Sequence, residues 1–283
     1  MVLLIEEKKA EKLVDEAGFR TDGRKLDELR HLHVECGVIP NADGSAYIEH
    51  GGNKIYAAVY GPREVHPRHL ARADRGILRV FYRMATYSVW ERKSPAPNRR
   101  EVEISKVVKD ALEPVLFLEI YPNSALEVYI EVIAADGGTR CASTTVAALA
   151  LADAGIPMRD LVCGVAAGKA DGHIILDCND VEDKQGEADM PCAVVGGDKG
   201  ISLLQFDGDM TVEEIEKALE LVYKGAKVIN AMQHEALKRR YARIRDEVNP
   251  QLEQGEEAQA EGTEQPPEER EPVESVEETG GEQ

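Results

Sequence analysis

The feature that most constrains the fold is a strand-like segment that passes through a Gly-Gly turn into a helix-like segment. Residues 126–132 alternate apolar and polar side chains, which is the period of a half-buried strand. Residues 145–152 are rich in Ala and Leu, and a Gly and a Pro follow shortly, as is typical beyond the end of a helix. Residues 136–144, between them, contain two consecutive glycines and then Arg140. The sequence therefore predicts a strand, a tight turn and a helix that carries an arginine in its first turn.

This turn has the chemistry of an anion site. The first amides of a helix lack intrahelical acceptors and lie at the positive end of its dipole. Glycines let the backbone approach a ligand closely, and the Arg140 guanidinium offers two parallel donors to a phosphate. An ordinary strand-to-helix turn, with Ser143 or Thr144 as the N-cap, explains the same residues. On this segment alone, the two interpretations stay open.

Composition favours a protein of a reducing compartment. The chain has 283 residues, of which 43% are hydrophobic, so it can bury a substantial core. No apolar run approaches the roughly 20 residues that cross a bilayer, and the N-terminus turns polar at Glu6, too early for a signal peptide. The five cysteines are widely spaced, with no C-x-x-C pair, which favours free thiols. We therefore expect a cytoplasmic protein with no membrane segment.

Charge is distributed unevenly along the chain. The net charge is −19, and residues 251–283 hold twelve Glu against one basic residue, Arg270. This segment has few large apolar residues, a composition typical of disorder. We predict a short N-terminal helical extension over residues 1–17, a folded domain over 18–248 and a disordered acidic tail over 249–283. The acidic total disfavours non-specific duplex binding, but it allows a nucleic acid to bind on a local basic patch.

The order of the predicted elements indicates an α+β domain. Turn-bounded strands form an antiparallel meander between residues 31 and 60. A helix is predicted over residues 101–118, with a proline that kinks or ends it. Two further hairpins follow, and a capping box at Thr211 begins a long helix that ends near Arg245. Mixed sheets covered by helices are the expected architecture.

Four local features combine into one candidate site. The first is the helix start at Arg140, and the second is the carboxylate pair Asp183 and Asp189, in an acidic loop before a strand. Two basic segments complete the set: residues 98–100 and the loop around Arg68. Two carboxylates beside an anion pocket repel each other unless a divalent cation or a proton lies between them. A solvated surface loop is the alternative on local grounds.

Five segments stand out in order along residues 18–245. They are Arg20-Thr21-Asp22-Gly23-Arg24, residues 60–64 with 66–69, Pro97-Asn98-Arg99-Arg100-Glu101, residues 136–143, and residues 183–189 followed by Met190-Pro191. Together they resemble the RNase PH family, and within it the catalytic RNase PH-like subunit of the archaeal exosome. The resemblance implies the RNase PH fold, which is similar to the second domain of ribosomal protein S5.

The resemblance also implies an activity. It indicates a phosphorolytic 3′→5′ exoribonuclease that acts on single-stranded RNA with inorganic phosphate as co-substrate. Phosphate would attack the last internucleotide phosphorus and release a nucleoside 5′-diphosphate, and the reverse reaction would add nucleotides. In this scheme Arg140 and the amides of Cys141, Ala142 and Ser143 bind the phosphate.

Further roles follow from the same resemblance. Asp183 is the expected general acid and Asp189 the expected Mg²⁺ ligand, and since the two could exchange these roles, both are candidates for catalysis and for the metal. Arg99 and Arg100 are expected to hold the RNA backbone near its 3′ end, and Arg68 matches the family's pore-loop arginine. These are phosphate contacts, so degradation should be largely independent of sequence.

Partners are implied as well. The family resemblance suggests a hexameric ring of three heterodimers with a related, non-catalytic RNase PH-like subunit, topped by S1-domain cap proteins. One alternative is a non-catalytic RNA-binding ring scaffold, which the intact set of Arg140, Asp183 and Asp189 disfavours. Another is a homohexameric RNase PH that trims tRNA, which the basic loop at residues 63–69 and the acidic tail disfavour.

Overall fold

The computed structural model describes residues 12–15 and 17–261, with side chains up to residue 247. Contacts divide the chain into two units, residues 1–240 and 241–283. Both sheets belong to the first unit. Helix α4, Val212–Glu261, begins in the first unit, and its C-terminal part is the described portion of the second.

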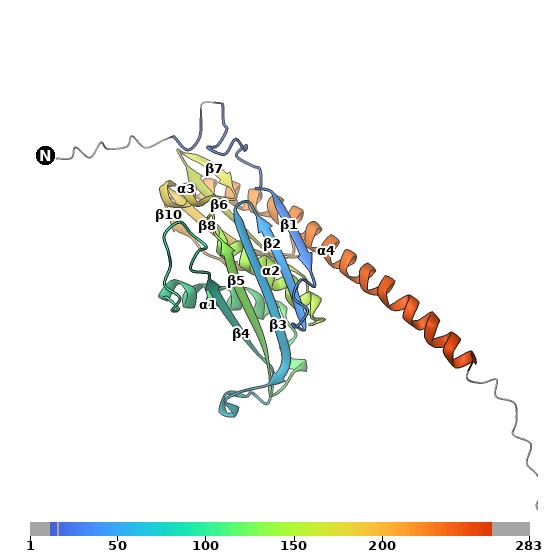
Figure 1. Ribbon diagram of the computed structural model, residues 1–283. Coiled ribbons are helices and arrows are strands. Elements are labelled where there is room, and N and C mark those ends of the chain that lie inside the picture. The colour runs from blue at the N-terminus through green and yellow to red at the C-terminus, as the bar shows by residue number, and fades with distance from the viewer. Residues whose placement is uncertain (1–11, 16, 262–283) are drawn as a thin grey trace, which may run out of the picture. The chain divides into compact units, whose positions relative to one another are not determined.

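The first sheet has the strand order β1-β2-β3-β5-β4 (Figure 1). Strands β1 to β3 and β5 pair antiparallel, and β4 pairs parallel with β5. Along β5 the apolar side chains predicted to alternate are buried, so the expected half-buried strand is confirmed. The bounds are β1 Leu32–Cys36, β2 Gly44–His50, β3 Asn53–Glu64, β4 Ile77–Met84 and β5 Ser124–Ala134.

The second sheet has the order β10-β8-β6-β7, and β9 also pairs with β8. All of its pairings are antiparallel. The two hairpins predicted from the sequence thus belong to one sheet. The bounds are β6 Val162–Ala170, β7 His173–Leu176, β8 Ala188–Val195, β9 Gly200–Leu204 and β10 Asp207–Gly208.

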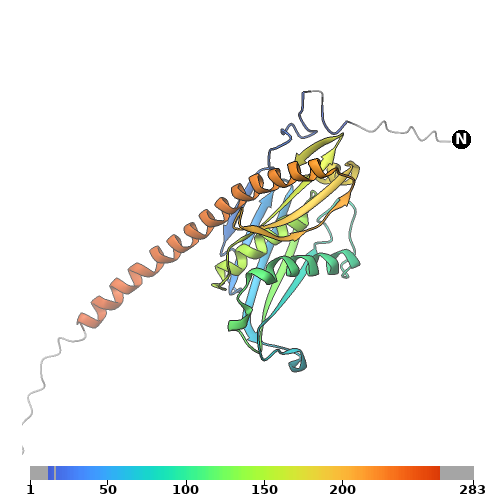
Figure 2. The same cartoon turned by 180° about the vertical axis from the view of Figure 1, so that it is seen from behind.

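Helices separate and cover the two sheets (Figures 1 and 2). Helix α2, Thr139–Asp153, packs between them, and helix α1, Arg99–Leu112, packs beside it on the first sheet. A Cβ on Gly164 of β6 would lie 2.1 Å from the carbonyl oxygen of Cys141, so only glycine permits this approach to α2. The first part of α4 packs through Val222 and its neighbours on the second sheet. The α+β architecture, with mixed sheets covered by helices, is confirmed.

Local capping signals fix the helix starts. Asn98 and Glu101 form a capping box at α1, and the box predicted at Thr211 is present at α4. Helix α1 spans Arg99–Leu112 and not the predicted 101–118, because Pro114 ends the helix instead of only kinking it. The short helices are α3 Asp180–Gln185 and the 3₁₀ turns Arg68–Leu70, Glu113–Val115 and Leu118–Ile120.

Three expectations differ from the structure. The acidic segment expected as a loop forms α3, because Asn179 and Glu182 make a capping box. In the described part of the N-terminal extension Val14 bridges Arg20 and no helix forms, while residues 1–11 lie outside the described residues. Helix α4 continues past Arg245 to Glu261, since this segment is rich in the helix formers Glu, Gln and Ala. The rest of the predicted tail, residues 262–283, is outside the described residues.

Across the described chain, no helix has the length and apolar character needed to cross a membrane.

Candidate functional site

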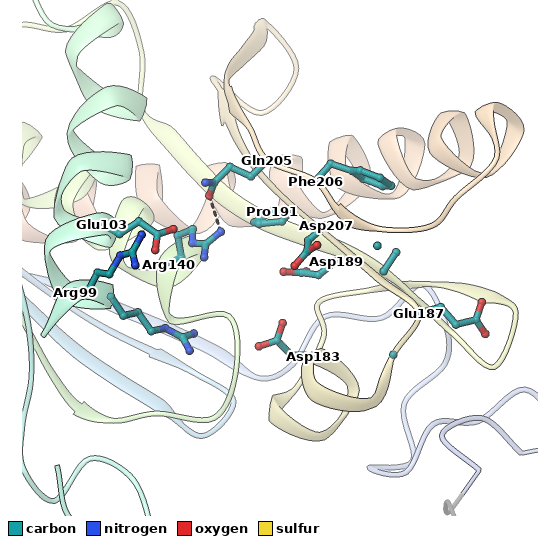
Figure 3. A pocket seen from close by; sticks show the side chains of 14 residues that line it. Arg99, Glu103, Arg140, Asp183, Glu187, Asp189, Pro191, Gln205, Phe206 and Asp207 are labelled. Atoms are coloured by element: carbon teal, nitrogen blue, oxygen red, sulfur yellow. Dashed lines mark hydrogen bonds between the residues drawn. The ribbon is translucent and has the colours of Figure 1, made fainter.

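Three of the four predicted features meet at one cavity of about 780 Å³ (Figure 3). The start of α1 contributes Arg99 and Arg100, α2 contributes Arg140, α3 contributes Asp183 and β8 contributes Asp189. Four elements thus place three arginines and two carboxylates around one space. The other lining residues are Glu103, Gly186, Glu187, Ala188, Pro191, Gln205, Phe206, Asp207 and Gly208.

A smaller recess of about 60 Å³ lies at the N-terminus of α2 and shares Arg140, Asp183 and Asp189 with the large cavity. Its size suits a small anion and not a nucleotide. Gly138 is the N-cap of α2, in the left-handed conformation with φ of 68°, and neither Ser143 nor Thr144 caps the helix. The recess is lined by the residues Arg100, Gly138, Thr139, Arg140, Cys141, Ala166, Cys178, Asp183, Asp189 and Pro191.

The unpaired amides at the start of α2 come earlier in the chain than the sequence predicted. The amides of Cys141 and Ala142 donate to the carbonyl oxygen of Gly138, at 3.1 and 3.2 Å. Within the described residues, the amides of Thr139 and Arg140 have no such acceptor. Because the first amides of a helix are the ones left unpaired, Thr139 and Arg140 supply the donors that point out of the helix.

The Arg140 side chain is held by a neutral partner. Its Nη1 donates to Oε1 of Gln205 at 2.5 Å, the bond drawn in Figure 3, and its Nε is buried without a protein acceptor. An amide oxygen orients the guanidinium without cancelling its charge. The arginine therefore keeps both its positive charge and an unused donor for an anion.

The environment of Asp189 disfavours its ionised form. Burial raises the pKa of Asp189 to about 7, and the negative charge of Asp183 adds to this effect, while Arg140 opposes it. Asp207 is the cross-strand partner of Asp189 in the β8–β10 ladder and further disfavours its ionised form. Near neutral pH Asp189 therefore retains a proton in about half of the molecules, whereas an ordinary aspartate is ionised.

This retained proton predicts a pH-dependent stability change for Asp189→Asn. With a folded pKa near 7 and an unfolded pKa near 3.8, native Asp189 holds more protons than the unfolded chain between these values. Stability of the wild type should therefore fall as pH rises through this window, by at most about 4 kcal/mol. Asp189→Asn lacks this loss, so its free energy of unfolding relative to wild type should increase from pH 4 to pH 7.5.

Chemical denaturation in EDTA across this pH range measures the difference. Asp198→Asn, at an exposed aspartate in the turn before β9, is the control and should show no comparable trend. A stability difference for Asp189→Asn that does not change with pH would contradict the raised pKa.

Three predicted site residues lie outside the cavity and the recess. Ala142 and Ser143 are fully buried within α2 and line neither space, because the helix has already turned them inward. Arg68 is exposed and pairs with Glu64, Nε to Oε1 at 2.8 Å. Glu64 lies opposite Ser124 at the start of β5, while the site lies beyond its other end, so about 30 Å of strand separates them. The roles assigned to all these residues stay predictions.

Sequence reasoning missed Thr139, Gln205 and Asp207. The rule that the first amides of a helix are unpaired would have identified Thr139 as a donor. Gln205 and Asp207 lie in no recognisable motif, and only the pairing of β9 and β10 with β8 brings them to the cavity.

The donor set is compatible with Mg²⁺. No cluster of three or more His, Cys, Asp or Glu able to hold a metal ion occurs in the described part of the chain. Mg²⁺ commonly takes one or two carboxylates and completes its shell with water and substrate phosphate oxygens. Asp183 and Asp189, beside an anion recess, fit that pattern of binding.

Family models match most of the chain. Residues 28–157 match domain 1 of the 3′ exoribonuclease family (RNase PH), and residues 160–225 match its domain 2. The rice (Oryza sativa) Rrp46 crystal structure superposes with a TM-score of 0.70 at 24% identity, covering 77% of this chain and all of that one. This likeness supports the fold.

Curated relatives are much closer in sequence. The exosome complex component Rrp41 of Thermococcus gammatolerans is 59% identical over 237 residues, 84% of this chain and 95% of the relative. Rrp41 of Pyrococcus abyssi is 58% identical over 87% of this chain and 98% of its own length. Rrp41 of Methanopyrus kandleri is 53% identical over 83% and 98%. The predicted fold and exoribonuclease class are confirmed, and the chain belongs to the RNase PH family of 3′ exoribonucleases.

Proposed function

We propose that this chain is the catalytic subunit of an archaeal exosome, a phosphorolytic 3′→5′ exoribonuclease that shortens single-stranded RNA with inorganic phosphate. One observation carries the proposal: an anion recess with Arg140 at its mouth adjoins two carboxylates in a cavity flanked by Arg99 and Arg100. A hydrolase that activates water does not need a second anion site beside the RNA phosphate. The names of the archaeal relatives support the exosome assignment.

Inorganic phosphate binds in the recess. The amides of Thr139 and Arg140 and the free Nε of Arg140 donate to its oxygens, and Gln205 orients the guanidinium. Bound this way, phosphate leaves one oxygen free to attack the last internucleotide phosphorus in line with the departing 3′ oxygen. This assignment moves the donors from Ala142 and Ser143 to the residues that line the recess.

The departing 3′ oxygen receives a proton from Asp183, the exposed carboxyl of the pair. Asp189 is half-buried beside Asp183, and its raised pKa lets it hold a proton near neutral pH. Asp189, with Asp183, would hold Mg²⁺, which when bound supplies positive charge near the developing negative charge of the reacting oxygens. Arg99 and Arg100, which line the same cavity, hold the RNA backbone.

The enzyme works as part of a ring with a related RNase PH-like subunit and S1-domain caps, in the cytoplasm. The name Rrp41, carried by its relatives as a component of a complex, supports the assembly. A non-catalytic scaffold would not need a half-buried carboxylate of raised pKa, Asp189, beside an unpaired arginine donor. A homohexameric tRNA-trimming RNase PH is the enzymatic alternative. The oligomeric state of the active enzyme distinguishes it from an exosome subunit.

The decisive experiment uses the purified chain, alone and with the related RNase PH-like subunit, on 5′-labelled oligoadenylate with Mg²⁺. Shortening that requires added phosphate and releases ADP is the expected result. Release of AMP without phosphate would exclude phosphorolysis. Full activity of the chain alone as a homohexamer would favour the RNase PH alternative, and no shortening in either state would favour the scaffold.

Arg68 should act on long RNA only. Its distance from the site means that a bound tetranucleotide cannot reach it, whereas a long oligoadenylate can. Arg68→Ala should weaken binding of the long RNA and lower the slope of log K against log salt by about 1, and it should leave the tetranucleotide unaffected. Filter binding at several salt concentrations measures both.

Arg239→Ala is the matched control for Arg68→Ala. Arg239 is also exposed and also pairs with a glutamate four residues earlier, Glu235. It should leave the salt slope unchanged. Equal effects of the two substitutions would show that Arg68 contributes only general positive charge.

A further inference from the structure

A buried carboxylate lies between strand β7 and helix α3. Asp177 is 3% exposed and adopts the left-handed conformation with φ of 58°. Its Oδ2 accepts from the Arg30 amide at 2.8 Å and from Arg30 Nε at 3.0 Å, and its Oδ1 accepts from Arg30 Nη2 at 2.7 Å. His50 Nε2 lies 2.9 Å from Oδ2. These four contacts and an ion pair with Arg24 Nη1 at 3.6 Å fix this side chain, although it lines neither the recess nor the cavity.

Arg30 reaches from Asp177 to the glycine turn before α2. Its Nη1 donates to the carbonyl oxygen of Asp136, and its Nη2 approaches the carbonyl oxygen of Gly137 at 3.4 Å. Asn53 holds the same turn from the other side, with Nδ2 donating to the Gly137 oxygen at 2.6 Å. One guanidinium therefore joins Asp177 to the turn that leads into the anion recess.

Arg20 fixes the other side of Asp177 to helix α3. Its Nη2 donates to the carbonyl oxygen of Asp177 at 2.8 Å, and its Nε donates to Oε1 of Glu182 at 2.7 Å. Glu182 is buried and also completes the cap of α3 through the Asn179 amide at 2.9 Å. These bonds give a structural role to the Arg20 segment, which lines neither the cavity nor the recess.

The glycine turn also lies directly against the start of α3. A Cβ on Gly137 would lie 2.5 Å from both the carbonyl carbon of Asn179 and the amide nitrogen of Asp180. Gly137 also has a φ of 67°, so both its conformation and its contact require glycine. Any shift of α3 relative to the turn must therefore disturb this contact or the Arg30 bonds.

We propose that Arg30, held by Asp177, is a positioning residue that sets the distance between the phosphate turn and Asp183 on α3. The inference rests on the proposed role of Asp183 as the acid for the departing 3′ oxygen. The nucleophile is bound by the turn and α2, and the acid is carried by α3, so the reaction depends on how these two segments lie together. Misplacing reacting groups by about 1 Å can cost about 10²-fold in rate.

The test compares two leaving atoms. One oligoadenylate has an ordinary last linkage, and the other has sulfur in place of the bridging 3′ oxygen. In both, a phosphate oxygen attacks phosphorus and the bond from phosphorus to the bridging atom breaks. Oxygen leaves with a proton from the acid, whereas sulfur leaves with its electron pair as a stable thiolate and needs none. Loss of the acid should therefore slow the oxygen substrate and spare the sulfur substrate.

Single-turnover rates on both substrates are measured for the chain assembled with its ring partner. Asp183→Asn is the reference for a missing acid. Arg30→Lys keeps a positive charge but cannot span Asp177 and the turn, and should slow the oxygen substrate about 100-fold and the sulfur substrate less than about fivefold. Asp177→Asn should show the same pattern, because Asn tolerates the left-handed backbone while losing the charge. If Arg30→Lys does not fold, Asp177→Asn provides the test.

Arg240→Lys is the control. Arg240 contacts Asp153, the last residue of α2, at 3.4 Å, so the same substitution is made at the opposite end of that helix. Both substrates should react within about twofold of wild type. If Asp183→Asn is specific for oxygen but Arg30→Lys and Asp177→Asn slow both substrates equally, the positioning role is overturned and the proposed function stands. If Asp183→Asn itself slows both equally, the acid assignment fails and the inference fails with it.

Discussion

Asp183→Asn should reduce phosphorolysis of oligoadenylate by about 10²–10⁴-fold, the usual contribution of a general acid. The substituted amide keeps the size of the side chain but cannot give a proton to the departing 3′ oxygen. Asp183 is exposed at the edge of the cavity, so the change should leave the fold intact. RNA affinity should stay within a few-fold of wild type, because Arg99 and Arg100 hold the backbone.

Phosphate-dependent release of ADP, measured beside RNA binding, checks this prediction. Asp180→Asn is the matched control, since Asp180 lies on the same short helix, pairs with Lys184 and does not line the cavity. It should retain near wild-type turnover. Retained activity in Asp183→Asn would move the acid role to Asp189, and equal losses in both variants would indicate that α3 has been disturbed.

Arg140→Lys should lower kcat/KM for phosphate by about 10²–10³-fold, which is the loss expected for a preorganised donor to a reacting anion. Lysine keeps the charge but lacks the planar fork, so it cannot bond Gln205 and the anion together. The loss should fall mainly on the phosphate dependence, because Arg140 binds the nucleophile and not the RNA. Initial rates at varied phosphate and saturating RNA separate the effect on phosphate binding from any effect on RNA binding.

Gln205→Glu supplies a second test of the same site. A carboxylate would still bind Nη1 of Arg140, but it would neutralise the guanidinium and weaken its hold on phosphate. The KM for phosphate should therefore rise while RNA affinity is unchanged. An unchanged phosphate dependence in both Arg140→Lys and Gln205→Glu would place the attacking phosphate elsewhere.

Local chemistry made much of this protein readable from its sequence. The alternation along residues 126–132 fixed a half-buried strand, and the capping box at Thr211 fixed a helix start, because these signals depend only on near neighbours. The same reasoning failed at α3, where a capping box at Asn179 was overlooked within an acidic run. The sequence placed phosphate donors at Cys141, Ala142 and Ser143, whereas the structure pairs the Cys141 amide with Gly138 and buries the other two residues.

The sequence by itself determined the family, the glycine turn with Arg140 and the carboxylate pair, because each is a pattern within a short segment. Only the tertiary structure decided that Arg140 is oriented by Gln205, that the pKa of Asp189 is raised and that Arg30 joins the glycine turn to Asp177. These properties come from burial and from pairings between segments far apart in the chain. A burial-dependent pKa or a strand register has no local sequence signal, since its cause lies in whichever segments the fold brings together.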